Sequence, residues 1–209
     1  MRKIITISRE FGSGGRELGK RLAEHLGLDY FDGEIVEELS KETNLDKDYL
    51  TGKLEKAVAH YPASVARSFS RIAGASNSAM LIAKQQKVIK ALAQDKDCVI
   101  VGRGADSVLA DMKPYKIFVY ADMSSKIARC KSRMEGGEAA SDKTVERQIK
   151  SVDKNRKALN DLYSSHVWGD KSGYNLCVNT TGMVIKDIIR SIAEIITQYF
   201  DSIQNGGNQ

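Results

Sequence analysis

The sequence predicts an α/β fold in which a parallel sheet is covered by helices. Five short segments rich in β-branched and aromatic residues recur along the chain, with helical stretches between them. Helical connections between strands favour parallel pairing through right-handed crossovers. With 209 residues, the chain is long enough to form one domain with its own core. The expected strands are Lys3–Ser8, Leu28–Asp32, Cys98–Val101, Tyr115–Tyr120 and Asn175–Thr180.

The connecting segments carry apolar residues at helical spacing. The helix after the first strand repeats leucine every four residues and is expected to end at Gly27, a good residue for leaving a helix. Ser78–Gln94, Lys143–Ser165 and Val184–Phe200 are further amphipathic helices. We expect Ser202–Gln209 to form a frayed tail.

Composition and charge exclude several classes of protein. Met1 leads into a strand pattern without the apolar core of a secretory signal, and no apolar run approaches the ~20 residues that span a bilayer. Three scattered cysteines suit reduced thiols in the cytoplasm. The net charge is +5, and Lys126–Lys157 alone holds ten lysine or arginine residues against five acidic ones. This basic segment indicates a nucleotide clamp, a nucleic-acid surface or a solvated helix face.

A glycine-rich turn between the first strand and the first helix is the strongest functional signal. Gly12, Gly14 and Gly15 carry no Cβ, so backbone N–H groups there can approach an anion closely. The helix that follows adds unpaired N–H groups and the positive end of its dipole. The turn therefore predicts a phosphate cradle, with a glycine-rich turn that binds nothing as the alternative.

The cradle departs from the standard phosphate loop, G-x-x-x-x-G-K-[ST]. A literal match at Gly14–Lys20 would place its lysine on the solvent side of the first helix, so we reject that register. Gly14 and Gly15 instead stand where G-K is expected, which replaces the lysine by glycine. Arg9 and Arg16 flank the loop and are candidates for the missing positive charge.

Two further strand ends carry polar residues. Arg103 lies in a Gly-Arg-Gly turn after a buried strand, at the edge where open parallel sheets bind ligands, and is placed for bidentate phosphate contact. Asp32 ends the second strand and can orient a ligand, bind Mg²⁺ through water, or cap the helix at Gly33.

The helix Lys143–Ser165 places a charged pair on its inward stripe. Arg156 lies among the apolar residues with Asp153 one turn before it, and an inward charge needs a partner. Either Asp153 aims Arg156 at a transferred phosphoryl group, or the two form a structural ion pair. With Arg133 on the preceding helix and a flexible connection at Gly136–Gly137, the region is expected to close as a lid.

Gly33–Asp97 is too long for a simple crossover and is expected to be a helical insertion that binds substrate. Its candidates for acceptor recognition are Arg67, Arg71, Ser76 and Asn77, nominated by their place in the chain. The rival function is nucleic-acid binding through the basic face of Lys143–Ser165. That face lacks interleaved aromatic residues for stacking on bases, which disfavours nucleic acid.

The chain resembles the cytidylate kinase-like family, a branch of the nucleoside monophosphate kinases within the P-loop fold. The matching segments follow in order along nearly the whole chain and are ITISREFGSGGRELGKRLAEHLG at 5–27, YFD at 30–32, VIVGRGA at 99–105, KIFVYAD at 116–122, VDKNR at 152–156 and NLCVNTTGM at 175–183.

The resemblance implies one P-loop kinase-like domain, with a five-stranded parallel sheet and helices on both faces. Its core would be residues 1–32, 95–125 and 172–204, with a helical acceptor insertion at 33–94 and a lid at 126–171. It also implies phosphoryl transfer from ATP, with Mg²⁺, to CMP or dCMP.

The resemblance further assigns site residues by position. Gly12, Ser13, Gly14, Gly15, Arg16 and Glu17 would hold the donor phosphates, and Asp32 and Arg103 the acceptor. Arg16, Arg133 and Arg156 would neutralise the charge in transfer, with Asp153 as the acid of a D-x-x-R pattern.

Three positions depart from authentic cytidylate kinases, which carry lysine, threonine and aspartate where this chain has Gly15, Glu17 and Val101. The alternatives to a nucleoside monophosphate kinase are therefore a catalytically weak regulatory protein that binds nucleotides and a kinase for another small-molecule acceptor. The sequence leaves the acceptor and the oligomeric state open, a homo-oligomer included.

Overall fold

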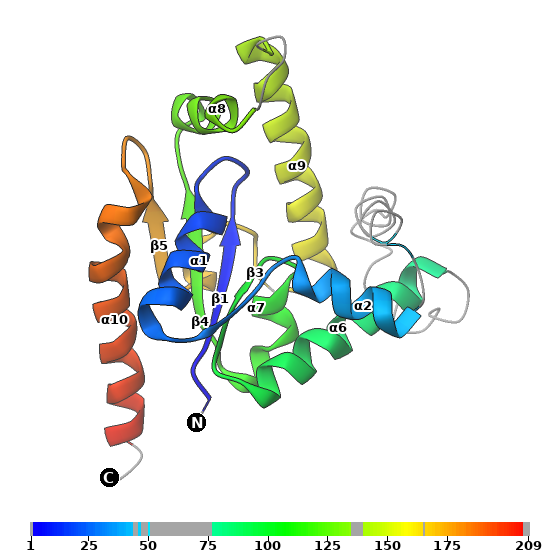
Figure 1. Cartoon of the computed structure of the whole chain (residues 1–209), viewed down its shortest axis with the longest axis vertical. Coiled ribbons are helices and arrows are strands. Elements are labelled where there is room, and N and C mark those ends of the chain that lie inside the picture. The colour runs from blue at the N-terminus through cyan, green and yellow to red at the C-terminus, as the bar shows by residue number, and fades with distance from the viewer. Residues whose placement is uncertain are drawn as a thin grey trace.

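A five-stranded parallel sheet lies at the centre of the protein, in the strand order β2-β3-β1-β4-β5 (Figure 1). The computed structural model describes residues 2–43, 46, 50, 77–134, 140–164 and 166–206. The strands are β1 (Ile4–Arg9), β2 (Asp29–Phe31), β3 (Cys98–Val101), β4 (Tyr115–Tyr120) and β5 (Leu176–Asn179). The predicted parallel sheet is confirmed, and all five strands lie where the residue pattern places them.

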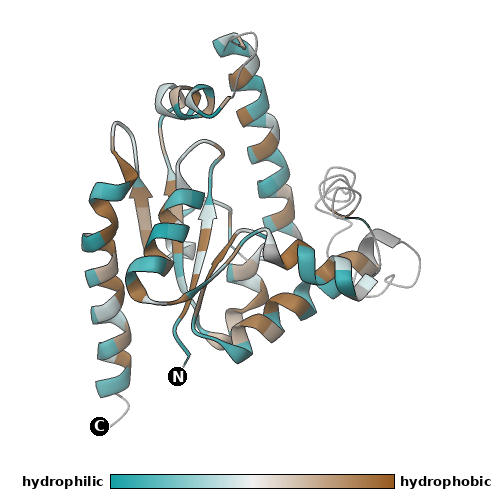
Figure 2. Cartoon of the chain, viewed as in Figure 1, coloured by the Kyte–Doolittle hydropathy of each residue, from teal (hydrophilic) through white to brown (hydrophobic). Residues whose placement is uncertain are grey.

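Helices cover both faces of the sheet because its strands alternate apolar side chains between the two faces. Ile5, Ile7 and Val99 pack beneath α1 (Gly15–Leu26) and α10 (Ile185–Gly206). Ile4, Cys98 and Ile100 pack beneath α6 (Asn77–Asp95) and α7 (Ala105–Val108). Figure 2 shows hydrophobic residues gathered on the strands and on helix sides that face them.

The first helix begins and ends at glycines in left-handed backbone conformation. Gly14 precedes α1 with φ 85°, and Gly27 follows it with φ 65°, as the sequence predicts. Lys20 lies in the second turn of α1 and is exposed, so the literal loop match at Gly14–Lys20 is wrong. The loop register that ends at Gly14 and Gly15 is the one that the fold adopts.

The last helix is longer than the sequence predicts. We expected a frayed tail from Ser202, but α10 continues to Gly206, which corrects that prediction for Ser202–Gly206. Residues 201–205 are exposed, so packing does not hold them. Once a helix has formed, each added residue gains one hydrogen bond at low cost, and no proline interrupts this segment. Residues 207–209 lie outside the described part of the chain.

The predicted insertion contributes α2 (Glu34–Thr43), which packs on α6. Arg67, Arg71 and Ser76 lie outside the described residues, and Asn77 begins α6. The predicted lid region contains α8 (Met123–Ser132) and α9 (Asp142–Tyr163), and its Gly136–Gly137 connection lies outside the described residues. Two short 3₁₀ turns, η1 (Ala110–Met112) and η2 (Lys171–Gly173), lead into β4 and β5.

None of the helices described here has the length and apolar character that a bilayer crossing requires.

Candidate phosphate-binding site

The loop between β1 and α1 has the backbone geometry of a phosphate cradle. Gly12 and Gly14 adopt φ values of 79° and 85°, which L side chains rarely adopt. A Cβ on Gly12 would lie 2.9 Å from the carbonyl oxygen of Lys126, so the loop also packs closely against α8. The first hydrogen bond of the helix runs from Leu18 N–H to Gly14 O. The N–H groups of residues 15–17 therefore have no partner within the helix and point out of its N-terminal end.

Contacts from distant elements hold this loop in place. Phe11 N–H donates to Asp153 Oδ1 of α9 at 2.6 Å. Lys126 Nζ of α8 lies 2.9 Å from Glu10 Oε2, and this lysine is almost fully buried. Figure 1 shows α8 and α9 beyond the carboxyl ends of β1 and β4, beside the loop. The loop is therefore held in one conformation, and such preorganisation lowers the entropy cost of binding for any ligand that it takes.

Two cavities open at the carboxyl ends of the strands. The larger, about 320 Å³, lies over the loop and is lined by its glycines and by Arg16 and Arg133. The smaller, about 30 Å³, lies at the Gly-Arg-Gly turn beside Arg103. Arg9 and Arg156 line both cavities, so their guanidinium groups lie between the phosphate loop and the turn after β3.

The site carries more positive than negative charge. Asp32 is buried and takes ion pairs from two arginines, with Arg16 Nε 2.5 Å from Oδ2 and Arg9 Nη2 3.8 Å from Oδ1. Burial, followed by the charge of the neighbouring Arg156, lowers the pKa of Arg9 to about 9, although Asp32 acts to raise it. Burial also lowers the pKa of Arg156. An anion in these cavities would relieve this repulsion. Arg16, Arg103 and Asp32 all act on the charges of both Arg9 and Arg156.

Arg156 reaches from α9 to the phosphate loop. Its Nη1 donates to the carbonyl oxygen of Arg9 at 3.0 Å, and its guanidinium lies 5.6 Å from the centre of the Phe11 ring. Asp153 lies 3.9 Å from Arg156 and accepts from Phe11 N–H, so the acid contacts both the arginine and the loop. The ion pair is present and its acid also holds the loop, while the role of Arg156 toward a transferred phosphoryl group stays a prediction.

Asp153 should make stability depend on pH in the opposite sense to an ordinary paired aspartate. Burial raises its pKa from 3.8 to about 6. The folded protein then binds this proton more tightly than the unfolded chain, so the associated stability is complete below pH 4 and lost as pH rises through 6. Urea unfolding of wild type and Asp153→Asn at pH 4.5 and 7.5 should show the wild-type advantage shrinking by about 1 kcal/mol at the higher pH, after solvent screening. A difference between the two proteins that is constant with pH would contradict this assignment.

The remaining sequence candidates lie around the same loop. Arg133 Nη2 is 3.3 Å from Glu17 Oε2, which links the end of α8 to the first turn of α1. Glu17 also pairs with Arg21 at 2.9 Å. Arg103 is half-buried and adopts a left-handed φ of 60° between Gly102 and Gly104. A non-glycine residue in this conformation stores strain of the kind that clusters at binding sites.

The sequence analysis did not identify the residues from other elements that hold the loop in place. Lys126, Glu10 and Thr180 are separated widely in sequence, and Thr180 Oγ1 donates to Ser13 O at 2.7 Å. Lys126 was counted only as part of a basic segment, and no local pattern marks it as buried. Arg129, counted in the same segment, donates to the carbonyl oxygens of Thr180 and Met183 and thereby fixes the entry to α10.

The residues fit phosphate better than they fit a metal held by side chains. In the described part of the chain, no three His, Cys, Asp or Glu side chains converge as a metal site. Glu17 and Asp32, two carboxylates beside the loop, are already paired with arginines. The glycine turn and the arginines instead offer N–H donors, which suit phosphate oxygens.

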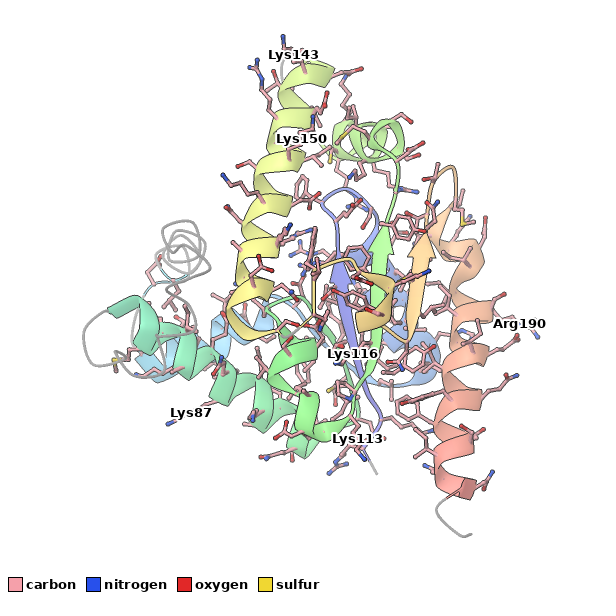
Figure 3. The ribbon with its side chains drawn as sticks, turned by 180° about the vertical axis from the view of Figure 1, so that it is seen from behind. Lys87, Lys113, Lys116, Lys143, Lys150 and Arg190 are labelled. Carbon is pink, nitrogen blue, oxygen red and sulfur yellow. The ribbon has the colours of Figure 1, made fainter. Side chains whose placement is uncertain are left out.

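The basic stripe of α9 lies away from this site. Figure 3 shows Lys143 at the outer end of α9, and Lys150 is exposed and pairs with Glu146 one turn away. Trp168 packs edge-on against Phe118 of β4 with ring centres 5.2 Å apart, as an anchoring aromatic beside the smaller cavity.

Comparisons with known proteins agree with this geometry. A search of curated proteins finds no significant match. Among solved structures, an uncharacterized protein from Eubacterium ventriosum is 26% identical, with 96% of this chain and 99% of that chain covered and a TM-score of 0.66. Two shikimate kinases share the fold. The one from Acinetobacter baumannii, solved with shikimate, is 14% identical with 95% of each chain covered and a TM-score of 0.52. The one from Bacteroides thetaiotaomicron is 12% identical, with 92% of this chain and 97% of that chain covered and a TM-score of 0.53.

The family match rests on the sequence itself and covers the loop, the arginine turn and the lid region. The model of the cytidylate kinase-like family matches residues 4–182, which is most of the chain. The chain therefore belongs to the cytidylate kinase-like family, and with its P-loop kinase-like fold this supports a kinase-like phosphotransferase.

Proposed function

We propose that this protein transfers the γ-phosphoryl group of ATP to a nucleoside monophosphate, with CMP or dCMP as the first acceptors to test. The observation that carries the proposal is the position of Arg9 and Arg156, which line both the cavity over the phosphate loop and the cavity at the arginine turn. A group passing from a donor on the loop to an acceptor at the turn would cross between these two arginines.

In this mechanism the loop holds the donor and Arg103 with Asp32 holds the acceptor. The attacking atom is an acceptor phosphate oxygen, which is largely ionised at neutral pH, so no general base is required. The new P–O bond forms as the bond between the γ-phosphorus and the β–γ bridging oxygen breaks, and ADP leaves with that electron pair. Positioning and charge neutralisation supply most of the catalysis in such reactions. Arg156, Arg16 and Arg133 are the proposed sources of that neutralising charge, and Asp153 positions Arg156.

Magnesium is proposed to arrive with ATP on its phosphate oxygens. Mg²⁺ commonly keeps several waters and binds through substrate phosphates with one or two carboxylates. Glu17 and Asp32 are already paired with arginines. The proposed mechanism therefore assigns no separate step to the metal.

The test is an assay of ADP release from ATP with CMP, dCMP, UMP, AMP and GMP, each as sole acceptor. Shikimate serves as a non-nucleotide acceptor. We expect acceptor-dependent turnover with at least one nucleoside monophosphate, highest with CMP or dCMP. No acceptor-dependent ADP with any of the five would overturn the proposal, and turnover with shikimate alone would reassign the acceptor. For the arginine variants described below, Arg190→Ala is the matched control, because Arg190 projects outward from α10 (Figure 3) and is exposed.

A second candidate, a weakly catalytic regulatory protein that binds nucleotides, is favoured by one observation. The loop carries Gly15 and Glu17 where lysine and threonine stand in authentic cytidylate kinases. This candidate requires ADP or ATP to raise the melting temperature without measurable turnover. Acceptor-dependent ADP release that is lost in Arg156→Ala would exclude it.

A further inference from the structure

Two positions of the phosphate loop have exchanged residue types relative to the standard pattern. In G-x-x-x-x-G-K, the first glycine lies five residues before the second. With Gly14 as the second glycine, the first glycine falls at Arg9 and the lysine falls at Gly15. The chain therefore has a cation where the pattern has glycine, and glycine where the pattern has the cation.

The structure shows that the two changes depend on each other. A Cβ built on Gly15 would lie 2.6 Å from Arg9 Cβ and 2.9 Å from Arg9 Cγ. Both Cβ positions are fixed by the backbone, so no choice of rotamer relieves the overlap. A side chain at position 9 and a side chain at position 15 thus exclude each other in this loop. The absence of the lysine is the condition that admits Arg9.

A second glycine makes room for the far end of Arg9. A Cβ on Gly102, at the turn after β3, would lie 1.6 Å from Arg9 Nη1. The guanidinium consequently lies against bare backbone, with Asp32 3.8 Å from its Nη2 and with both cavities beside it. Two glycines from different elements therefore frame one buried arginine.

Arg9 suits the role of the loop cation better than Arg16 does. The Arg9 side chain is 15% exposed, whereas that of Arg16 is 69% exposed. Arg16 binds Asp32 through its Nε at 2.5 Å, and it lines only the larger cavity. Arg9 lies deeper and borders both the donor and the acceptor side.

We propose that Arg9 replaces the phosphate-loop lysine and contacts the phosphoryl group in transfer, and that Gly15 and Gly102 are the residues that admit its side chain. This inference rests on the proposed function. Arg9 is then the residue that supplies the positive charge of the missing lysine, a role for which the sequence offers both Arg9 and Arg16.

The experiment is an exchange of the two residue types in the full chain. Four proteins are compared for ADP binding by calorimetry and for turnover, namely wild type, Arg9→Gly, Gly15→Lys and the double variant Arg9→Gly/Gly15→Lys. Each single change should lower turnover by about 10²-fold, in line with the loss of one charge-stabilising group. The double variant should recover to within about tenfold of wild type, because it restores both the space and the cation of the standard pattern.

Two further variants keep the test decisive if Gly15→Lys does not fold. Arg9→Met keeps the packing of the arginine stem and removes its charge, so it should melt near wild type and lose about 10²-fold in turnover. Gly15→Ala adds only the Cβ and should lower the melting temperature much more in wild type than in the Arg9→Gly background, where only Val119 Cβ, at 3.3 Å, remains close. Arg190→Ala again serves as the surface-arginine control.

The outcomes separate this inference from the proposed function. Wild type that binds no ADP overturns the proposed function and this inference with it. Wild type that binds ADP and turns over, together with Arg9→Met at the wild-type rate, overturns this inference alone. Single effects that simply multiply in the double variant would also overturn it, because they would show that positions 9 and 15 are independent.

Discussion

Arg156→Ala is expected to lower turnover by about 10²–10³-fold while the protein stays folded. Arg156 lines both cavities and donates to the carbonyl oxygen of Arg9, so its loss removes a charge facing the transferred group and one support of the loop. The loss should appear mainly in kcat, because charge neutralisation matters most in the transition state. Steady-state kinetics with ATP and the best acceptor give the measurement.

Two companion variants define what the Arg156 result means. Arg156→Lys should rescue little, because one ammonium cannot reproduce the planar fork of a guanidinium that bonds to Arg9 O and still faces the cavities. Arg147→Ala changes an exposed arginine of the same helix and should leave kcat within twofold of wild type, about the scatter of surface substitutions. An Arg156→Ala variant with wild-type kcat would remove this arginine from the mechanism.

Gly102→Ala should weaken ADP binding and also destabilise the protein. Gly102 has φ 78°, and an added Cβ would lie 1.6 Å from Arg9 Nη1. The backbone strain alone costs about 1–2 kcal/mol, and the clash must also displace the buried guanidinium from the site. Calorimetry with ADP and urea unfolding measure the two effects separately.

The matched control for Gly102→Ala is Gly27→Ala. Gly27 has φ 65°, but a Cβ there would meet no atom within 4 Å. The two alanines therefore share the backbone strain and differ in the displacement of Arg9. Gly27→Ala should lose a similar 1–2 kcal/mol of stability and keep wild-type affinity for ADP. Equal ADP affinity in both variants would show that Arg9 does not depend on the space at Gly102.

The sequence predicted the sheet well because the signals for its strands are local. β3 and β4 have the predicted bounds, since both are short runs rich in β-branched or aromatic residues, and Gly102 directly follows β3. The first helix was equally readable, because Gly14 and Gly27 mark its ends directly. The extension of α10 to Gly206 was missed, because helix propagation past the packed region leaves no apolar pattern.

The candidate site was only partly predictable, because its key choices depend on contacts across the fold. The loop pattern offered both Arg9 and Arg16 as the missing cation, and nothing local separates them. Their different burial follows from the approach of Gly102 and α9, which lie far along the chain. The Lys126–Glu10 ion pair could not be predicted from the sequence for the same reason, because its two residues are 116 positions apart.

Calorimetric titration of the wild-type chain with ADP, with and without Mg²⁺, tests the central claim most directly. If arginines bind the polyphosphate of a nucleotide at the loop after β1, ADP should bind at one site per chain. Its affinity should fall as salt rises, because charged contacts are screened. Binding should persist without added metal, because Glu17 and Asp32 beside the loop pair with arginines and Glu10 pairs with Lys126. No heat of binding from ADP at either condition would contradict the assignment of this loop as a nucleotide site.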